Sequence, residues 1–240
     1  MTAGKLLLIR HGESTANVAA TAAELAGEET IAVGSRDADV PLSALGDQQA
    51  AALALRLEAE FDDKRATPAL VWASPYLRAI RTAQLALGSI PFVIDERLRD
   101  RELGIIDALT ARGVEARLPD EAARRRWLGK FYYRPPGGEA WTDVAFRLRS
   151  FVRDLDSADD RPVVLFTHDA VVSLFLYVLL GWTEQQLDEF LLTSVVGNAS
   201  VTTLVRDDAR WRVEAFSDDS HLARAGLPAT AHPGAARVTE

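Results

Sequence analysis

Four short apolar stretches of the sequence are each closely followed by side chains that could handle a phosphoryl group. These side chains are Arg10 and His11 after the first stretch, Arg78 after the second, Asp100 and Glu102 after the third, and His168 and Asp169 after the fourth. A guanidinium binds two oxyanion oxygens with its planar fork, and a neutral imidazole can attack phosphorus or hydrogen-bond to its oxygens. Together these residue types predict a site for a phosphoryl group.

The apolar stretches themselves are predicted to be buried strands, at Lys5–Arg10, Ala69–Ala73, Phe92–Ile94 and Pro162–Thr167. Helical spacing of apolar residues predicts helices at Ser43–Phe61, Tyr76–Leu87, Trp141–Leu155 and Asp169–Leu180. Strands alternating with helices predict an α/β fold, a three-layer α/β/α sandwich with a mainly parallel central sheet. Because the carboxyl ends of parallel strands meet at one edge of a sheet, we expect the candidate side chains to converge there.

The remaining segments are predicted to be peripheral. Ala199–Val205 and Trp211–Phe216 alternate and predict a hairpin at the edge of the sheet. Two insertions, at about residues 15–40 and 107–139, are expected to form a small cap above a single domain of residues 1–217. Residues 218–240 are interpreted as an extended or poorly ordered tail, in which His221 and His232 are solvent-exposed bystanders.

Composition excludes several classes of protein. The 240-residue chain has 48% hydrophobic residues, a formal net charge of −8 and no cysteine. The acidic balance argues against nucleic acid and anionic membranes as partners, and the absence of cysteine removes thiolate nucleophiles and Cys-ligated zinc. The longest nearly apolar stretch, Ala170–Trp182, is shorter than the roughly 20 residues of a membrane span, so no transmembrane helix is expected. The apolar run Leu6–Ile9 is shorter than the roughly 7–15 residues of a secretory signal, so we expect a cytoplasmic protein. The residues do not distinguish a monomer from a homodimer.

Several motifs together resemble one family. They are Leu8–Ser14 with Asn17, Pro41–Gly46, Ser74–Ala83, Gly137–Glu139, Thr167–His168 and Asn198–Val201. Their order and spacing resemble the histidine phosphatase superfamily, in its phosphoglycerate mutase-like branch, from about residue 5 to about residue 205. Each motif alone is common, whereas the combination is specific.

The resemblance implies a role for each matching residue. His11 matches the nucleophile that becomes a phosphohistidine, and Arg10 and Arg78 match the two arginines that clamp the phosphate. His168 matches the second pocket histidine, and Asn17 matches a position that touches the phosphate or substrate. The two arginines supply the positive charge that phosphoryl transfer requires, so no metal and no cofactor are expected.

The proton donor is chosen among three carboxylates. Asp100 ranks first, because it stands where the family has a carboxylate four residues before a glycine. Asp169 ranks second, since a more distant acid phosphatase branch uses an Asp after this His; a helix N-cap is the competing interpretation. Glu102 ranks third, because it lies close enough to Asp100 to compete with it.

Arginines in the predicted cap could bind a second anionic group of the substrate. We expect Arg134 to do so, because it precedes the segment Pro135–Gly138. Arg124 and Arg125 are interpreted as part of a solvated helix face, as most charge runs are.

The resulting hypothesis is a phosphatase that hydrolyses a small phosphorylated metabolite, a phosphomonoester, through a phosphohistidine. Two alternatives stay open on the residues alone. One is mutase-type transfer of the phosphoryl group to another hydroxyl, and the other is a non-catalytic module that binds phosphorylated ligands.

Overall fold

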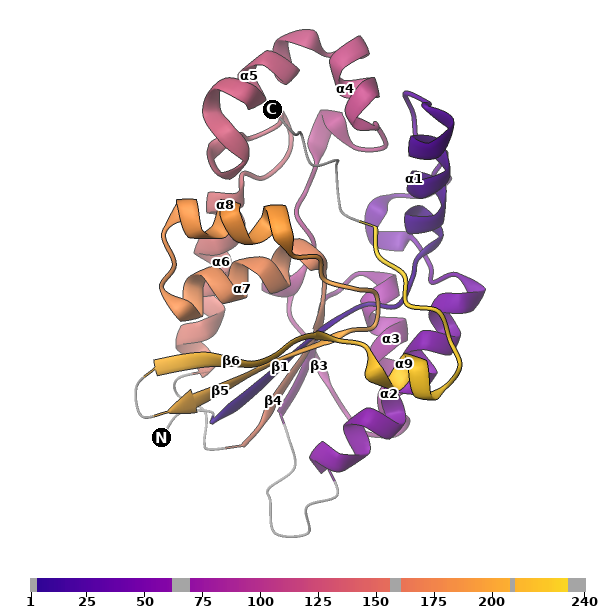
Figure 1. The fold of residues 1–240 in the computed structure, drawn as a ribbon, viewed down its shortest axis with the longest axis vertical. Helices are drawn as coiled ribbons and strands as arrows, with labels where there is room; N and C mark the ends of the chain where they lie inside the picture. The colour runs from indigo at the N-terminus through magenta and orange to yellow at the C-terminus, as the bar shows by residue number, and fades with distance from the viewer. Residues whose placement is uncertain (1–3, 62–69, 156–160, 208–209, 233–240) are drawn as a thin grey trace.

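A mixed sheet forms the centre of the molecule (Figure 1). The computed structural model describes residues 4–61, 70–155, 161–207 and 210–232. Within these residues six strands lie in the order β3-β2-β4-β1-β5-β6, with bounds β1 Lys5–Arg10, β2 Leu70–Ala73, β3 Val93–Ile94, β4 Val163–Thr167, β5 Val201–Asp207 and β6 Arg210–Asp218. The first four are mutually parallel, and β5 pairs antiparallel with both β1 and β6.

Helices cover both faces of this sheet (Figure 1). One layer contains α6 (Trp141–Leu155), α7 (Asp169–Leu180) and α8 (Glu184–Thr193), and the other contains α2 (Ala44–Phe61), α3 (Leu77–Leu87) and α9 (Ser220–Arg224). Successive side chains of β1 alternate between the layers, with Leu6 and Leu8 packed on the first side and Leu7 and Ile9 on the second. The predicted three-layer α/β/α sandwich and the edge hairpin are therefore confirmed.

The third predicted strand differs from the expectation of full burial. Only Val93 and Ile94 are in the strand, and their exposed fractions are 58% and 51%. Because β3 pairs with β2 alone, it forms the edge of the sheet and has one unpaired side. An apolar run by itself did not distinguish an edge strand from a central one. Ala69, predicted to begin the second strand, lies outside the described residues.

The two insertions form a cap over the carboxyl edge of the parallel strands. They contain α1 (Thr15–Ala26), the 3-10 turn η1 (Asp37–Asp39), α4 (Ala111–Arg117) and α5 (Pro119–Tyr132), with η2 (Glu96–Leu98) and η3 (Gly104–Ile106) before the second insertion. The second insertion has its own apolar cluster, which contains Val114, Ala122 and Tyr133. A β-bridge between Thr30 and Leu109 joins the first insertion to the second. The cap is therefore a packed unit rather than two independent loops.

The described part of the C-terminal tail is ordered against the domain, contrary to our expectation. Residues 220–224 form α9, whose Leu222 is 1% exposed in the core. His221 is buried, and His232 is half-buried, so neither is a solvent-exposed bystander. This segment is rich in Ala, Gly and Pro and has too few large apolar residues to form a periodic pattern, so its packing could not be predicted from the sequence. Residues 233–240 lie outside the described part, and the proposed division at residue 217 stays a prediction.

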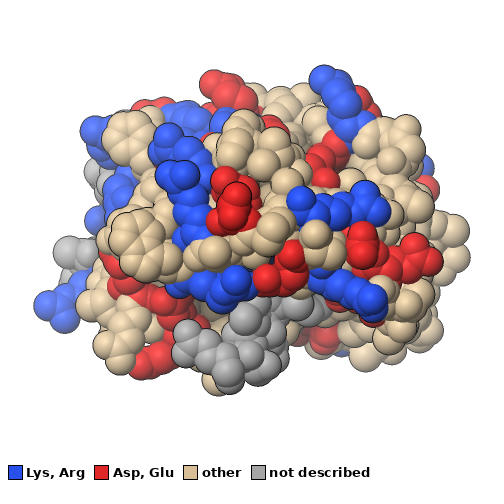
Figure 2. Space-filling view, turned by 90° about the horizontal axis from the view of Figure 1, so that it is seen from above, with Lys and Arg blue, Asp and Glu red and all other residues tan. Residues whose placement is uncertain are grey.

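Among the described helices, none is both long enough and apolar enough to cross a membrane. Seen from above the cap, basic side chains are interleaved with acidic ones rather than gathered in a stripe of one sign (Figure 2).

Candidate active site

The end of β1 carries the first two candidate residues into the centre of the molecule. Arg10 and His11 are each only 3% exposed. The His11 backbone N–H donates to the carbonyl of Thr167 at 2.9 Å, which ties the end of β1 to the end of β4. His11 therefore lies beside His168, with ring centroids 5.1 Å apart. The convergence predicted from the strand order is observed.

The hydrogen bonds of His11 identify its tautomer. Nδ1 lies 2.7 Å from the carbonyl oxygen of Gly12, which can only accept, so Nδ1 carries the proton. Nε2 accepts a hydrogen bond from Arg78 Nε at 3.2 Å and so bears a lone pair. Burial and the nearby Arg78, His168 and Arg10 hold the pKa of His11 well below its usual value. His11 is thus a neutral imidazole whose Nε2 can act as a nucleophile.

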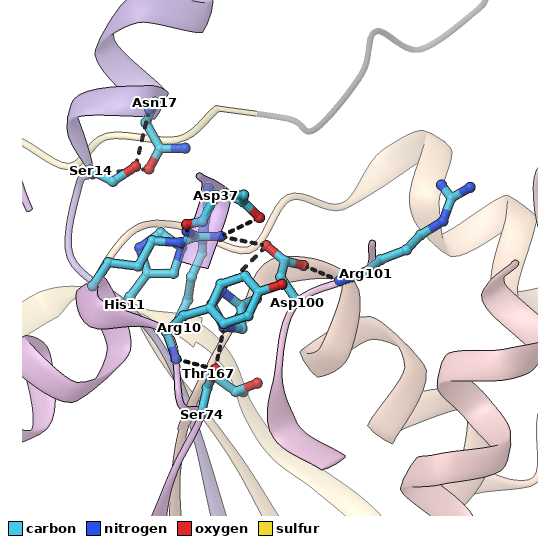
Figure 3. Close-up of polar contacts among 12 residues, drawn as sticks. Arg10, His11, Ser14, Asn17, Asp37, Ser74, Asp100, Arg101 and Thr167 are labelled. Atoms are coloured by element: carbon cyan, nitrogen blue, oxygen red, sulfur yellow. Dashed lines mark hydrogen bonds and ion pairs between the residues drawn. The ribbon is translucent and has the colours of Figure 1, made fainter. Parts of the chain in front are cut away.

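His168 is completely buried beside His11. Its Nε2 lies 2.8 Å from the hydroxyl of Ser74, and its Nδ1 lies 3.3 Å from Asp100 Oδ2. Burial, Arg78, Arg147 and Arg10 lower its pKa well below the usual value. Figure 3 shows Ser74, His11 and Asp100 around this centre. Ser74, which ends a strand in a Ser-Pro motif, is a site residue that the sequence hypothesis did not include.

The two arginines approach the centre from different elements. Arg10 donates from Nη1 to the carbonyl of Val196 at 2.5 Å and from Nη2 to that of His232 at 3.3 Å. Its buried Nε has no hydrogen-bond partner among the residues that the structure describes. Arg78, on the first turn of α3, contacts His11, Asp100 and Asp37. A buried guanidinium with an unmet donor is the feature expected of an oxyanion site.

Asp100 is the candidate proton donor that the structure places at the centre. Its Oδ2 accepts from Arg78 Nη2 at 3.1 Å, and its Oδ1 accepts from the backbone N–H of Arg101 at 2.9 Å. Glu139 and Arg147 hold the loop that carries it: Arg147 Nη2 donates to the carbonyl of Asp100 at 3.1 Å and to Glu139 Oε2 at 3.2 Å. The Gly-Gly-Glu motif therefore supports the loop that carries Asp100.

The other two carboxylates are placed differently. Helix α7 begins at Asp169 with His168 as its N-cap residue, so Asp169 is not the N-cap. Asp169 lines the cavity, and burial raises its pKa. Glu102 is half-exposed on the outside of the loop, where it accepts from the Tyr76 hydroxyl at 3.0 Å. Geometry thus keeps Asp100 and Asp169 as candidates and moves Glu102 away from the centre.

Asn17 and Arg134 have other partners. Ser14 and Asn17 form a capping box at the start of α1, and the Asn17 Oδ1 also accepts from Asn198 at 3.2 Å. Only the amide nitrogen of Asn17 is left to reach a ligand in the cavity that it lines. Arg134 is an exposed side chain that pairs with Asp143 and does not line the cavity.

Three other cations lie at the cavity, where we expected Arg134. Arg101, Arg125 and Lys130 line the cavity, so Arg125 does not belong to a solvated face. Within the described residues none of the three has a carboxylate partner. Burial, with Arg125 beside it, lowers the pKa of Arg101 to about 10, and burial with both arginines lowers that of Lys130 to about 8. Figure 3 shows Arg101 extending away from His11.

The cavity that contains these groups has a volume of about 280 Å³. Its floor is formed by Arg10 and His11, and its walls come from α1, α5 and the segment around Asp107. His232 also lines it, from the segment that the sequence left as a tail. Among the described residues no group of three or more His, Asp or Glu could hold a metal ion.

The comparisons with known proteins fit this geometry. The family model described as histidine phosphatase superfamily (branch 1) matches residues 6–219. The chain belongs to this superfamily. This histidine phosphatase is similar to the glucosyl-3-phosphoglycerate phosphatase of Mycolicibacterium vanbaalenii. The two are 31% identical over 248 residues, and the match covers 93% of this chain and 98% of the relative.

A second relative of this histidine phosphatase is the 6-phosphofructo-2-kinase/fructose-2,6-bisphosphatase of Gallus gallus. It is 30% identical over 188 residues, which are 78% of this chain and 35% of that longer protein. Among solved structures, the mycobacterial glucosyl-3-phosphoglycerate phosphatase in complex with VO3 has a TM-score of 0.71 and 29% identity, and covers 90% of this chain and 99% of its own. Like these relatives, the protein is a phosphatase.

Proposed function

We propose that this histidine phosphatase hydrolyses a small phosphomonoester that carries a second acidic group. The observation that carries the substrate class is the set of three cations, Arg101, Arg125 and Lys130, on the wall of the same cavity as His11. Arg101 donates to the carbonyls of Glu139 and Tyr133, and Lys130 lies over the Trp141 ring, but within the described residues none of the three cations has a salt bridge. Partly buried cations without a salt bridge favour an anion nearby. The volume of about 280 Å³ suits a small metabolite.

The proposed reaction has two steps. His11 Nε2 attacks phosphorus, the bond to the leaving oxygen breaks, and Asp100 in its acid form gives that oxygen a proton. A water then attacks the phosphohistidine, Asp100 takes up the proton of the water, and phosphate leaves with His11 restored. Arg10, Arg78 and neutral His168 hydrogen-bond to the phosphoryl oxygens, whose negative charge is greatest in the transition state.

The names of the relatives support the substrate class. A glucosyl-3-phosphoglycerate carries a carboxylate besides its phosphate, and a fructose 2,6-bisphosphate carries a second phosphate. In this chain the second anion is assigned to Arg101, on the loop that carries Asp100, and to Arg125 and Lys130 of the cap. Arg134, which pairs with Asp143, has no part in the proposal.

A matched pair of substrates tests the class. 3-Phosphoglycerate and glycerol 3-phosphate differ in a carboxylate, so their kcat/KM values should differ in wild type. We expect Lys130→Gln and Arg125→Gln to raise KM for 3-phosphoglycerate by about tenfold, the effect of losing roughly 1.4 kcal/mol, and to leave glycerol 3-phosphate unaffected.

Arg124→Gln is the matched control, because Arg124 is exposed on the same helix. An equal response of both substrates, or an equal effect of Arg124→Gln, contradicts the assignment of the second anion.

A further inference from the structure

Every N–H group of Arg78 already has a protein acceptor. Nε donates to His11 Nε2 at 3.2 Å, and Nη2 donates to Asp100 Oδ2 at 3.1 Å. Asp37 accepts the other three hydrogen bonds from Arg78. Arg78 Nη1 donates to the Asp37 carbonyl oxygen at 2.6 Å and to Asp37 Oδ1 at 2.9 Å, and Nη2 donates to Asp37 Oδ2 at 3.3 Å. Arginine has five N–H groups, so its hydrogen-bonding capacity is complete.

The other clamp arginine differs in this respect. In the described part of the chain, the buried Nε of Arg10 has no partner, and the acceptors of its other donors are neutral carbonyls, those of Val196 and His232. A phosphoryl oxygen can reach Arg10 without displacing a charged group. To bind Arg78 it has to displace an acceptor, and two of the acceptors are carboxylates.

Asp37 is the acceptor that is held least firmly. Within the described residues its carboxylate has hydrogen bonds from Arg78 alone, whereas the loop of Asp100 is fixed by Arg147 and by the backbone N–H of Arg101. Asp37 also begins the three-residue turn η1, and its side chain is 34% exposed. Dashed contacts in Figure 3 lead to both the Asp37 and the Asp100 carboxylates.

We propose that Asp37 is a specificity-determining residue whose carboxylate competes with the phosphoryl group of substrate and product for Arg78. The proposal rests on the proposed function, because it takes Arg78 as a phosphate ligand. Only an oxyanion with two strong acceptor oxygens can replace the bidentate carboxylate of Asp37 on Arg78. After hydrolysis, the return of the Asp37 carboxylate to Arg78 assists the release of phosphate.

Electrostatics around Asp37 supports an exchange of this kind. Burial raises the pKa of Asp37 despite the adjacent Arg78, and the Asp100 and Asp107 carboxylates act in the same direction. A bound phosphoryl group adds further negative charge next to three carboxylates. Movement of Asp37 away from Arg78 relieves this repulsion.

Asp37→Asn tests the proposal, since the amide keeps the size of the side chain and removes its charge. Isothermal calorimetry with inorganic phosphate, and inhibition by phosphate of p-nitrophenyl phosphate hydrolysis, give the affinity. We expect the Kd and Ki of phosphate to fall about tenfold and KM to fall with them. Slower product release should keep kcat level or lower it.

Asp39→Asn is the matched control, because Asp39 lies in the same turn and pairs with exposed Arg36. It should leave all four constants unchanged. Asp37→Ala, with its melting temperature compared with wild type, provides a second variant should the amide misfold.

Phosphate binding that stays the same or weakens in both Asp37 variants overturns the proposal, because a residue that only positions Arg78 gives that sign. Turnover of the wild type with a trapped phosphohistidine shows that the proposed function still holds in that case. Without turnover or phosphate binding in the wild type, the proposed function itself fails.

Discussion

Single hydrogen bonds decide which atoms of the site can react. The Gly12 carbonyl fixes the proton of His11 on Nδ1 and leaves the Nε2 lone pair toward Arg78. Types and order of the residues at the strand ends were enough to predict His11, Arg10, Arg78 and His168 as a cluster. The tautomer, in contrast, depends on a backbone carbonyl whose direction no residue pattern specifies.

Asp100 and Asp169 differ in a way that kinetics can separate. A proton donor matters most for a poor leaving group, and general acid catalysis typically gives roughly 10²–10⁴-fold. We expect Asp100→Asn to reduce hydrolysis of an alkyl phosphate by about that factor and to reduce hydrolysis of p-nitrophenyl phosphate far less. Asp169→Asn, the matched control at another carboxylate that lines the cavity, should affect both substrates alike.

If the leaving-group effect is found for Asp169→Asn and is absent for Asp100→Asn, the donor is Asp169. The order of candidates derived from the sequence and from the position of Asp100 beside Arg78 is then wrong.

Elements of the fold set the distance between these side chains. The start of α2 lies against the loop after β1, where a Cβ on Gly46 would come within 1.9 Å of the Glu13 carbonyl oxygen. This close approach gives the Pro41–Gly46 motif a physical reason, because no larger residue fits beside the loop that carries His11.

We expect Gly46→Ala to push that loop away from α2, at a cost of about 1–3 kcal/mol in the free energy of unfolding and with a fall in kcat. Urea denaturation and steady-state kinetics measure the two effects. Gly34→Ala is the control, since nothing lies within 4 Å of a Cβ at Gly34. Equal stability and activity of the two variants would contradict this role of Gly46.

Sequence periodicity predicted the elements of the sheet and its covering helices, because apolar faces packed on a sheet repeat regularly. Periodicity did not predict the elements of segments that contain few apolar residues. Helices α1, α4 and α5 were included only as insertions, and the segment that brings His232 to the cavity was interpreted as a tail. Asp37, Arg125 and Lys130 reach the site from these segments, so their side chains could not be placed from local pattern.

For the whole molecule, two completely or nearly completely buried histidines link stability to pH. Burial keeps the pKa of His11 and that of His168 well below 6.5, whereas an unfolded histidine takes up its proton near that value. Below about pH 6.5 the unfolded chain therefore binds more protons than the folded one. The free energy of unfolding should then fall as the pH is lowered from 7 to 5.5.

Each of these histidines contributes a slope of up to about 1.4 kcal/mol per pH unit in this range. Urea unfolding of wild type and His168→Gln at several pH values isolates one of them, because the other titrating groups are common to both proteins. The variant should show a flatter dependence. Parallel curves would mean that His168 takes up a proton in the folded state.

The phosphohistidine on His11 is the most direct measure of the catalytic mechanism. A phosphomonoester labelled in its phosphoryl group, mixed rapidly with the enzyme in the presence of EDTA and quenched in alkali, should leave acid-labile label on a peptide that contains His11. His11→Ala should carry no label and have no turnover, while its far-UV circular dichroism matches wild type. Turnover by His11→Ala, or label on any other residue of the wild type, would contradict the assignment of His11 as the nucleophile.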